Sequence, residues 1–345
     1  CARWTGWSGA DASVCPEAPE VEPIVIGVAL DETGWVSVYD QPNRIGLELG
    51  VADINAAGGV NGRPLELVYA VDNGGSPTQS ANAAIGLIDK GVDIGVVSCD
   101  FDVGGPAAVE FQNAGKVSFS VCASALLFGP PGGLPLAFSS GDSAAGFAST
   151  VAEYGYNVEG WRTAYSLLDN TIAYTAELCE TFNSRWELLG GTIVGEDQFT
   201  QGDESISTQI TRMKSLSEPP DVIHLCTYFP GIGSYVNQIR TAGIESPIAM
   251  ASEGDGTYWH AGVPNLSNIY YTAKGSIYGD DSISEINDFY ARFQEASGAP
   301  PTDGIGVGGY MITQMIKIAG ERAGTVDGAA LAAELEKFDN EPLLQ

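Results

Sequence analysis

From residue 23 onward, short apolar runs of strand length alternate with amphipathic segments of helix length. The apolar runs occupy residues 24–30, 65–71, 93–98, 117–121, 163–168, 192–195, 222–226, 248–251 and 269–273. The amphipathic segments occupy residues 43–57, 78–90, 106–113, 172–189, 204–216, 232–242, 284–296, 306–323 and 328–338. This alternation predicts parallel sheets that are covered by helices on both faces. A Gly/Pro-rich break at residues 129–135 divides it, so we predict an α/β protein with two doubly wound parallel-sheet lobes.

The loops that follow the predicted strands are the candidate binding region. In open α/β sheets, ligands bind outside the carboxyl ends of the strands. These loops lie at residues 31–39, 72–76, 100–105, 123–127, 169–174, 227–231 and 252–259. They are rich in glycine, aspartate and aromatic residues, which is typical of a binding cleft.

The charge of the chain excludes two classes of partner. It carries 15 basic and 44 acidic residues, a formal net charge of −29. Phosphate binding requires clustered cations, so the composition argues against nucleic acid and against docking on an anionic membrane surface. A solvated acidic surface is the plainer interpretation, and attraction of cationic ligands requires local evidence.

Six cysteines point to disulfides rather than to a metal site. They are Cys1, Cys15, Cys99, Cys122, Cys179 and Cys226. No two share a CxxC spacing, and the chain has only two histidines, so we predict no metal site. An even number of cysteines suits an oxidising compartment. Cys99 and Cys122 each end an apolar run and would meet if those strands are neighbours, whereas Cys1 is either lipid-modified or bridged to Cys15.

Motifs of catalysis are incomplete in this chain, so we predict no catalytic residue and no cofactor. The GxGxxG pattern at residues 304–309 follows a loop, whereas a dinucleotide site requires a strand before it, and Asp303 is expected to cap the helix that it opens. The serine in the run at residues 141–146 lacks the glycine spacing of a nucleophile elbow, because Ala145 interrupts it. His224 lies within a predicted strand, where a core histidine with satisfied hydrogen bonds is expected.

Several motifs resemble one known family. The first of them is PIVIGVAL at residues 23–30, and the next is DINAAGGVNG at residues 53–62. Further matches are Asp72 with SPTQ at residues 76–79, SVCAS at 120–124, YFPGIG at 228–233, AGI at 242–244 and SEGDG at 252–256. Together they resemble the leucine/isoleucine/valine-binding proteins, type I periplasmic binding proteins that serve ABC importers. The resemblance spans residues 23 to 338.

The resemblance implies two lobes that are joined by hinge strands and close on a ligand. The crossings are expected near residues 138–142 and 273–277. The expected division is therefore a tether at residues 1–22, a first lobe of residues 23–140 and 275–345, and a second lobe of residues 141–274. The family continues beyond residue 345 with a third crossing, and the lack of one here suggests truncation or cleavage.

The resemblance also implies which residues hold the ligand. Glu253 matches the glutamate that binds the ligand ammonium, and Ala123 with Ser124 matches part of the group that binds the carboxylate. The serine expected after the third strand is replaced by Asp100 and the residues that follow it, in a loop one residue longer. Asp102 has an alternative structural role as a cap of the helix predicted at residues 106–113.

Acidic and aromatic residues in the same loops favour a cationic ligand. The acidic candidates are Asp100, Asp102, Glu253 and Asp255. The aromatic candidates for cleft walls and cation–π contacts are Trp35, Tyr39, Phe101, Tyr174, Tyr228, Phe229 and Trp259, each of which has lobe packing as an equal alternative.

We therefore expect the extracytoplasmic solute-binding subunit of an ABC importer, periplasmic or lipid-anchored, that captures a small amine-bearing and cationic ligand. Its partners would be the permease subunits, and the protein would be a monomer without enzymatic activity. The alternatives are an aliphatic amino acid binding protein, a ligand-sensing receptor ectodomain and a small-molecule enzyme.

Overall fold

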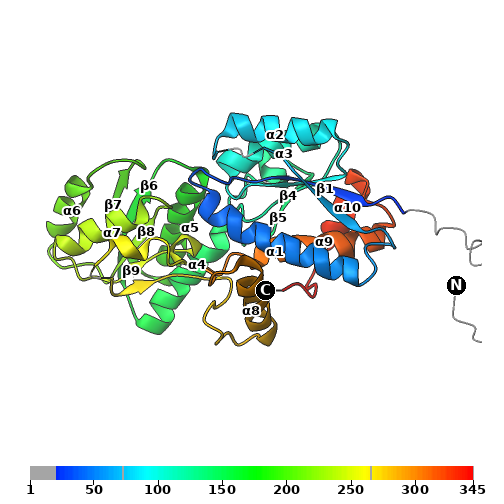
Figure 1. Cartoon of the computed structure of the whole chain (residues 1–345). Coiled ribbons are helices and arrows are strands. Elements are labelled where there is room, and N and C mark those ends of the chain that lie inside the picture. Colours follow the sequence, from blue (N-terminus) through cyan, green and yellow to red (C-terminus); the bar gives the residue numbers. More distant parts are fainter. Residues whose placement is uncertain (1–20, 72–73, 265, 345) are drawn as a thin grey trace, which may run out of the picture.

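A computed structural model describes residues 21–71, 74–264 and 266–344, which form two lobes side by side (Figure 1). The predictions for the tether, including Cys1 and Cys15, and the match at Asp72 lie outside the described residues. No helix within the described part of the chain is long and apolar enough to span a membrane.

The first lobe is built on a parallel five-stranded sheet in the order β2-β1-β3-β4-β5. Its strands are β1 (Ile24–Ala29), β2 (Leu65–Tyr69), β3 (Ile94–Val97), β4 (Ser118–Ser120) and β5 (Ala137–Ser139). Helices α2 (Pro77–Asp89) and α3 (Phe101–Asn113) pack on one face through an apolar cluster that includes Leu87 and Phe111. Helices α1 (Ser37–Ala56), α9 (Val307–Ala323) and α10 (Gly328–Leu335) cover the other face, where Leu47 and Ile316 lie in the core. Helix α8 (Ser284–Ser297) packs against α9.

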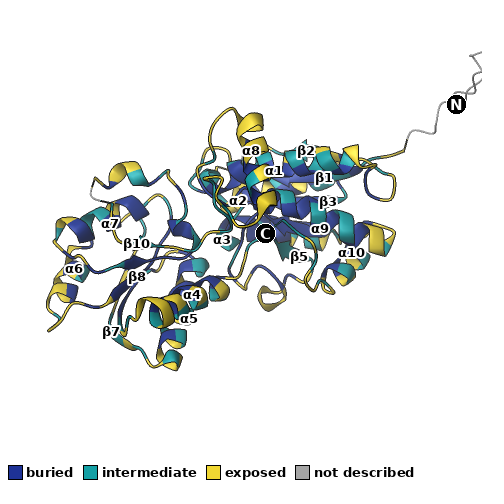
Figure 2. Ribbon diagram, turned by 90° about the horizontal axis from the view of Figure 1, so that it is seen from below, coloured by how far each residue is buried: buried dark blue, intermediate teal, exposed yellow. Residues whose placement is uncertain are grey.

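The second lobe repeats this architecture with a parallel sheet in the order β10-β9-β8-β6-β7. Its strands are β6 (Thr163–Asp169), β7 (Thr192–Phe199), β8 (Val222–Cys226), β9 (Ile248–Ala249) and β10 (Ile269–Tyr270). Helices α4 (Ala144–Tyr154) and α5 (Ala173–Leu189) cover one face, and α6 (Ser207–Lys214) and α7 (Ile232–Thr241) cover the other. Figure 2 shows the buried residues concentrated in the strands and on the inner faces of the helices. The predicted two-lobed, doubly wound α/β fold is confirmed.

Two helices begin earlier than the sequence pattern predicts. Helix α1 begins at Ser37 and α3 at Phe101, each five residues before a proline inside the helix, at Pro42 and Pro106. Proline is most common in the first helical turn, and the predicted starts at residues 43 and 106 lie directly after Pro42 and at Pro106. The prediction that Asp102 caps α3 is wrong because Asp100 occupies the N-cap position.

Two elements lie where the sequence pattern predicted none. Strand β5 has only three residues, directly after the Gly/Pro-rich break. Helix α4 follows it, and the Ser143 hydroxyl accepts the Gly146 amide as its cap. The chain passes between the lobes from β5 to α4 and returns after β10, and these two crossings meet where the Lys274 ammonium donates to the Ser140 carbonyl.

Candidate functional site

A cavity lies between the lobes, at the carboxyl ends of both sheets. The first lobe lines it with residues that include Trp35, Tyr39, Asp100, Ser124, Asp303 and Ile305. The second lobe lines it with residues that include Ile172, Tyr174, Tyr228, Glu253, Asp255 and Tyr258. The cavity is therefore built mainly from the loops that the alternation pattern predicts, together with the segment before α9, Phe147 of α4 and Lys274 after β10.

Glu253 is the buried carboxylate on the second-lobe side of the cavity. One oxygen accepts the Ala251 amide at 3.0 Å and the other accepts the Tyr174 hydroxyl at 2.8 Å. Burial raises the pKa of Glu253 to about 7, although these hydrogen bonds oppose the shift. A cation beside this carboxylate would restore its ionised form.

Asp100 is the buried carboxylate on the first-lobe side. It lies three residues after the end of β3, with a φ of 84°, and one carboxylate oxygen accepts the Asp102 amide at 2.8 Å. Burial, with a smaller contribution from the neighbouring Asp102 charge, raises the pKa of Asp100 to about 7. Cys99 and Cys122 are joined as a disulfide that ties the ends of β3 and β4 and lines the cavity.

Asp102 does not belong to the described residues that line the cavity. Its carboxylate accepts the Ala173 amide of the other lobe at 3.1 Å. Phe101 packs against Gly105 and the α2–α3 core, and Ala123 is buried in the same core. None of these three predicted site residues is among the described residues that line the cavity.

Two further acidic residues, Asp255 and Asp303, interact with each other where the lobes meet near α9. Asp255 accepts the Gly304 amide at 2.8 Å, and Asp303 accepts the Ile305 amide at 3.1 Å. Burial raises the pKa of Asp255 to about 6, and burial together with the Asp255 charge raises that of Asp303 to about 7. The sequence had marked Asp303 only as a helix cap, but the N-cap of α9 is Gly306.

Aromatic rings from opposite lobes meet across the cavity. The Trp35 and Tyr228 ring centroids are 4.8 Å apart, and Tyr39 and Tyr258 form an edge-to-face pair at 6.1 Å. The Phe229 amide donates to the Tyr39 hydroxyl at 3.2 Å, and the Phe229 ring packs against Tyr258 rather than lining the cavity.

Trp259 lies within the second lobe instead of at the cavity. It is buried in the core of that lobe, and its indole nitrogen donates to the Gly254 carbonyl at 3.2 Å. For Trp259 the structure supports the lobe-packing interpretation.

The charge of the cavity lining is strongly unbalanced. It contains the four carboxylates of Asp100, Glu253, Asp255 and Asp303. Lys274 is the one lysine or arginine among the described residues of the lining, and burial lowers its pKa. Ionised carboxylates in a water-poor cavity are costly without counter-charges, so this arrangement complements a cation far better than an anion.

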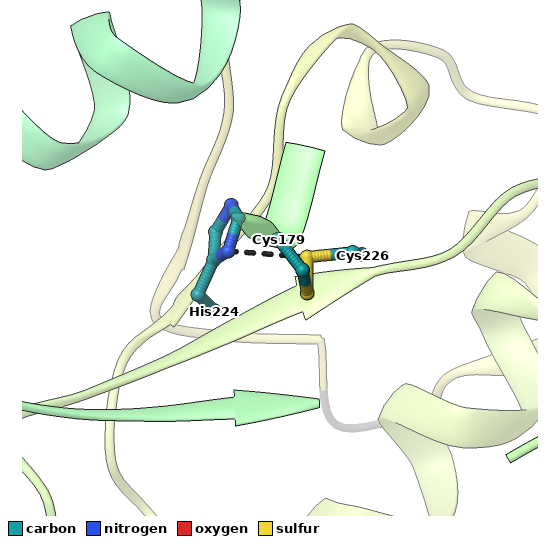
Figure 3. Close-up of side chains that lie close together, drawn as sticks. All are labelled: Cys179, His224 and Cys226. Carbon is teal, nitrogen blue, oxygen red and sulfur yellow. Dashed lines mark hydrogen bonds between the residues drawn. A yellow bond between two sulfur atoms is a disulfide. The ribbon is translucent and has the colours of Figure 1, made fainter. Parts of the chain in front are cut away.

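The sequence did not predict a second cluster, which lies in the core of the second lobe (Figure 3). Cys179 of α5 and Cys226 of β8 form a disulfide, and the Nδ1 atom of His224 lies 3.1 Å from the Cys226 sulfur. These three side chains have donor atoms suited to a metal, but their spacing along the chain gave no sign of it. The two sulfurs are bonded to each other, so the geometry is that of a structural cystine.

His224 itself is a core residue, as predicted. It stacks on Phe182 with centroids 3.9 Å apart, and burial lowers its pKa to about 3. Its Nε2 atom has no hydrogen-bond partner among the described residues, so the expected full satisfaction of this histidine is not found.

Comparisons with known proteins agree with the architecture. Residues 23–343 match the family model described as "Periplasmic binding protein". Leu/Ile/Val-binding protein homolog 3 of Brucella melitensis is 26% identical over 318 residues, which cover 90% of this chain and 82% of the relative. A Leu/Ile/Val-binding protein of Rhizobium johnstonii is 25% identical over 323 residues, which cover 92% and 84%.

A solved structure shows the same fold. The branched-chain amino acid transporter substrate binding protein of Streptococcus pneumoniae, in complex with isoleucine, has a TM-score of 0.80 to this chain. It is 22% identical, and the match covers 92% of this chain and 88% of that one.

Proposed function

Since the chain belongs to the periplasmic binding protein family, we propose that it is the extracytoplasmic solute-binding subunit of an ABC importer. It captures a small, amine-bearing and cationic ligand between its lobes and hands it to permease subunits. The protein acts as a monomer and performs no chemistry on the ligand. It is periplasmic or lipid-anchored on the cell surface.

The observation that supports a cationic ligand is the composition of the cavity lining, which contains four carboxylates and one lysine among its described residues. A ligand carboxylate placed among them would be repelled, because like charges about 4 Å apart cost about 4 kcal/mol at an effective dielectric constant of 20. A ligand ammonium instead forms charge-assisted hydrogen bonds with the same groups. The aromatic pairs offer ring faces for cation–π contacts.

The proposed roles follow from the positions of the side chains. Glu253 binds the ligand ammonium, and Asp100 supplies a second negative charge from the opposite lobe. Asp255 faces the same cavity, and the Ser124 hydroxyl, which donates to the Cys122 carbonyl at 3.1 Å, offers a neutral polar contact. Trp35, Tyr39, Tyr174 and Tyr228 form the walls.

The lobe boundaries and the disulfides belong to the same proposal. The first lobe comprises residues 23–140 and 275–345, and the second comprises residues 141–274. The Cys99–Cys122 and Cys179–Cys226 pairs form in the oxidising extracytoplasmic compartment.

A matched pair of ligands tests the proposal. Leucine and leucinamide share a side chain and an ammonium, but only leucine carries a carboxylate. We expect leucinamide to raise the melting temperature more than leucine does at neutral pH. Putrescine and choline serve as cations that lack both the leucine side chain and a carboxylate. Stabilisation by leucine alone would show an aliphatic amino acid binding protein and refute the cationic ligand class. Conversion of any bound compound to a product over several turnovers would refute the binding-protein proposal itself.

A further inference from the structure

Helix α5 begins at the cavity without a capping side chain from its own neighbourhood. Its N-cap residue is Ile172, whose side chain has no acceptor. The preceding Thr171 hydroxyl donates to the Asp169 carboxylate at 2.6 Å and is therefore turned away from the helix. The first amides of a helix require acceptors, and Ser, Thr, Asp or Asn normally provide them.

The missing acceptor comes from the other lobe. The Asp102 carboxylate accepts the Ala173 amide, the first of α5, at 3.1 Å. A negative charge at this position also interacts favourably with the helix dipole. Because Asp102 and Ala173 lie on opposite lobes, this hydrogen bond exists only while the lobes are together.

The turn that carries Asp102 is held in place before the lobes meet. Asp100 adopts a positive φ and accepts the Asp102 amide at 2.8 Å. The Cys99 amide donates to the buried Asp40 carboxylate at 2.8 Å, and the Cys99–Cys122 disulfide ties the same turn to the end of β4. The carboxylate that caps α5 is thus presented on a fixed support, which lowers the entropy lost when the bond forms.

The contact reaches the cavity through the first turn of α5. Tyr174 follows Ala173 and donates to Glu253 at 2.8 Å. One turn further along, Glu177 accepts the Leu126 amide of the first lobe at 2.9 Å. The start of α5 is therefore bonded to both the opposite lobe and the carboxylate proposed to bind the ligand.

We infer that Asp102 is a positioning residue, which caps α5 from the opposite lobe, favours closure in the absence of ligand and orients Tyr174 and Glu253. Its effect on ligand affinity rests on the proposed function, but its effect on closure does not. In the segment from Asp100 to Asp102, where the resemblance implies a ligand-binding serine, one residue thus makes a contact between the lobes instead.

Hydrogen–deuterium exchange on the ligand-free protein tests this inference. In Asp102→Ala we expect the amides at the start of α5 to exchange about twofold to thirtyfold faster, the range that corresponds to loss of a helix cap. Asp102→Asn keeps an acceptor without the charge and should give an intermediate rate. Small-angle scattering should show a larger radius of gyration for Asp102→Ala, since the open form gains population.

The matched control is Asp327→Ala. Asp327 caps α10 by accepting the Ala330 amide of its own helix, far from the cavity. This variant should speed exchange in α10 and leave both α5 and the radius of gyration unchanged. Equal exchange at α5 in wild type and Asp102→Ala would overturn the inference, as would an equal response at α5 in the control.

The two proposals can fail separately. If no compound of the ligand panel binds but wild type and Asp102→Ala still differ in exchange at α5, only the proposed function is refuted. If a cation of the panel binds but wild type and Asp102→Ala exchange equally at α5, only the role of Asp102 is refuted.

Discussion

Replacement of Glu253 by glutamine removes one charge from the cavity while conserving its shape. A glutamine oxygen can still accept the Ala251 amide or the Tyr174 hydroxyl, so the loop should keep its conformation. A hydrogen bond to a charged group contributes about 1.5–3 kcal/mol, so the Glu253→Gln variant should bind an ammonium ligand about 10- to 150-fold more weakly.

The pKa of Glu253 adds a signature that a packing defect would not produce. With a pKa of about 7, the carboxylate is about nine-tenths ionised at pH 8 and about one-tenth ionised at pH 6. A cation binds the ionised form, so the contribution of Glu253 to affinity should fall about tenfold between pH 8 and pH 6. Because the variant lacks this group, the ratio of wild-type to variant affinity should fall by the same factor.

Calorimetry with leucinamide or the strongest cation of the panel, at both pH values, measures this ratio. Glu180→Gln, on the exposed side of α5, is the matched control and should bind like wild type. Unchanged affinity in Glu253→Gln at pH 8 would remove Glu253 from the site. A loss of affinity that is the same at both pH values would indicate altered packing instead of a lost charge.

Two further predictions concern stability. Burial raises the pKa values of Asp40, Asp100, Glu253, Asp255 and Asp303, so the folded protein holds more protons than the unfolded chain between about pH 4 and pH 7. The free energy of unfolding of the ligand-free protein should therefore fall as pH rises through this window, and denaturant titrations that show a rise would contradict it. The double variant Cys179→Ala/Cys226→Ala should lose up to about 4 kcal/mol of stability, since its disulfide closes a 47-residue separation, and a loss below about 1 kcal/mol would show that the cystine is dispensable.

The fold was predictable because its signal is distributed along the whole chain. Buried parallel strands such as β3 and β8 are continuous apolar runs, and each is followed by a helix with one apolar face. The missed elements are those where this signal is weak. Strand β5 has three residues beside a glycine- and proline-rich stretch, and in α1 and α3 an internal proline concealed the true start.

The site was predictable only in part, because a loop assignment does not determine which side chains face the cavity. Asp100, Tyr174, Glu253 and Asp255 line it, and all four lie in the segments after strands that the sequence pattern predicts as loops, although Tyr174 belongs to the first turn of α5. Asp303 was missed as a site residue because it precedes a helix that returns to the first lobe from the end of the chain. Its approach to the cavity depends on how the lobes meet.

Asp102 shows how a shift in a helix start changes the role of a residue. With α3 beginning at Phe101, Asp102 lies in the first turn of the helix and points to the other lobe. The sequence offered two roles for it, ligand contact or cap of its own helix. Capping a helix of the opposite lobe could not be foreseen without the arrangement of the lobes.

The contacts between the lobes link closure to the proposed cationic ligand. Asp102 and Asp255 each accept a backbone amide of the opposite lobe, and these two hydrogen bonds form only when the lobes meet. Closure also buries Asp100, Glu253 and Asp303 around one cavity, and burial disfavours their ionised forms. The amide contacts therefore favour closure while the cavity carboxylates oppose it at neutral pH. A positively charged ligand offsets the cost of burying these carboxylates. Because it does so only in the closed form, it binds that form more tightly and shifts the population toward closure.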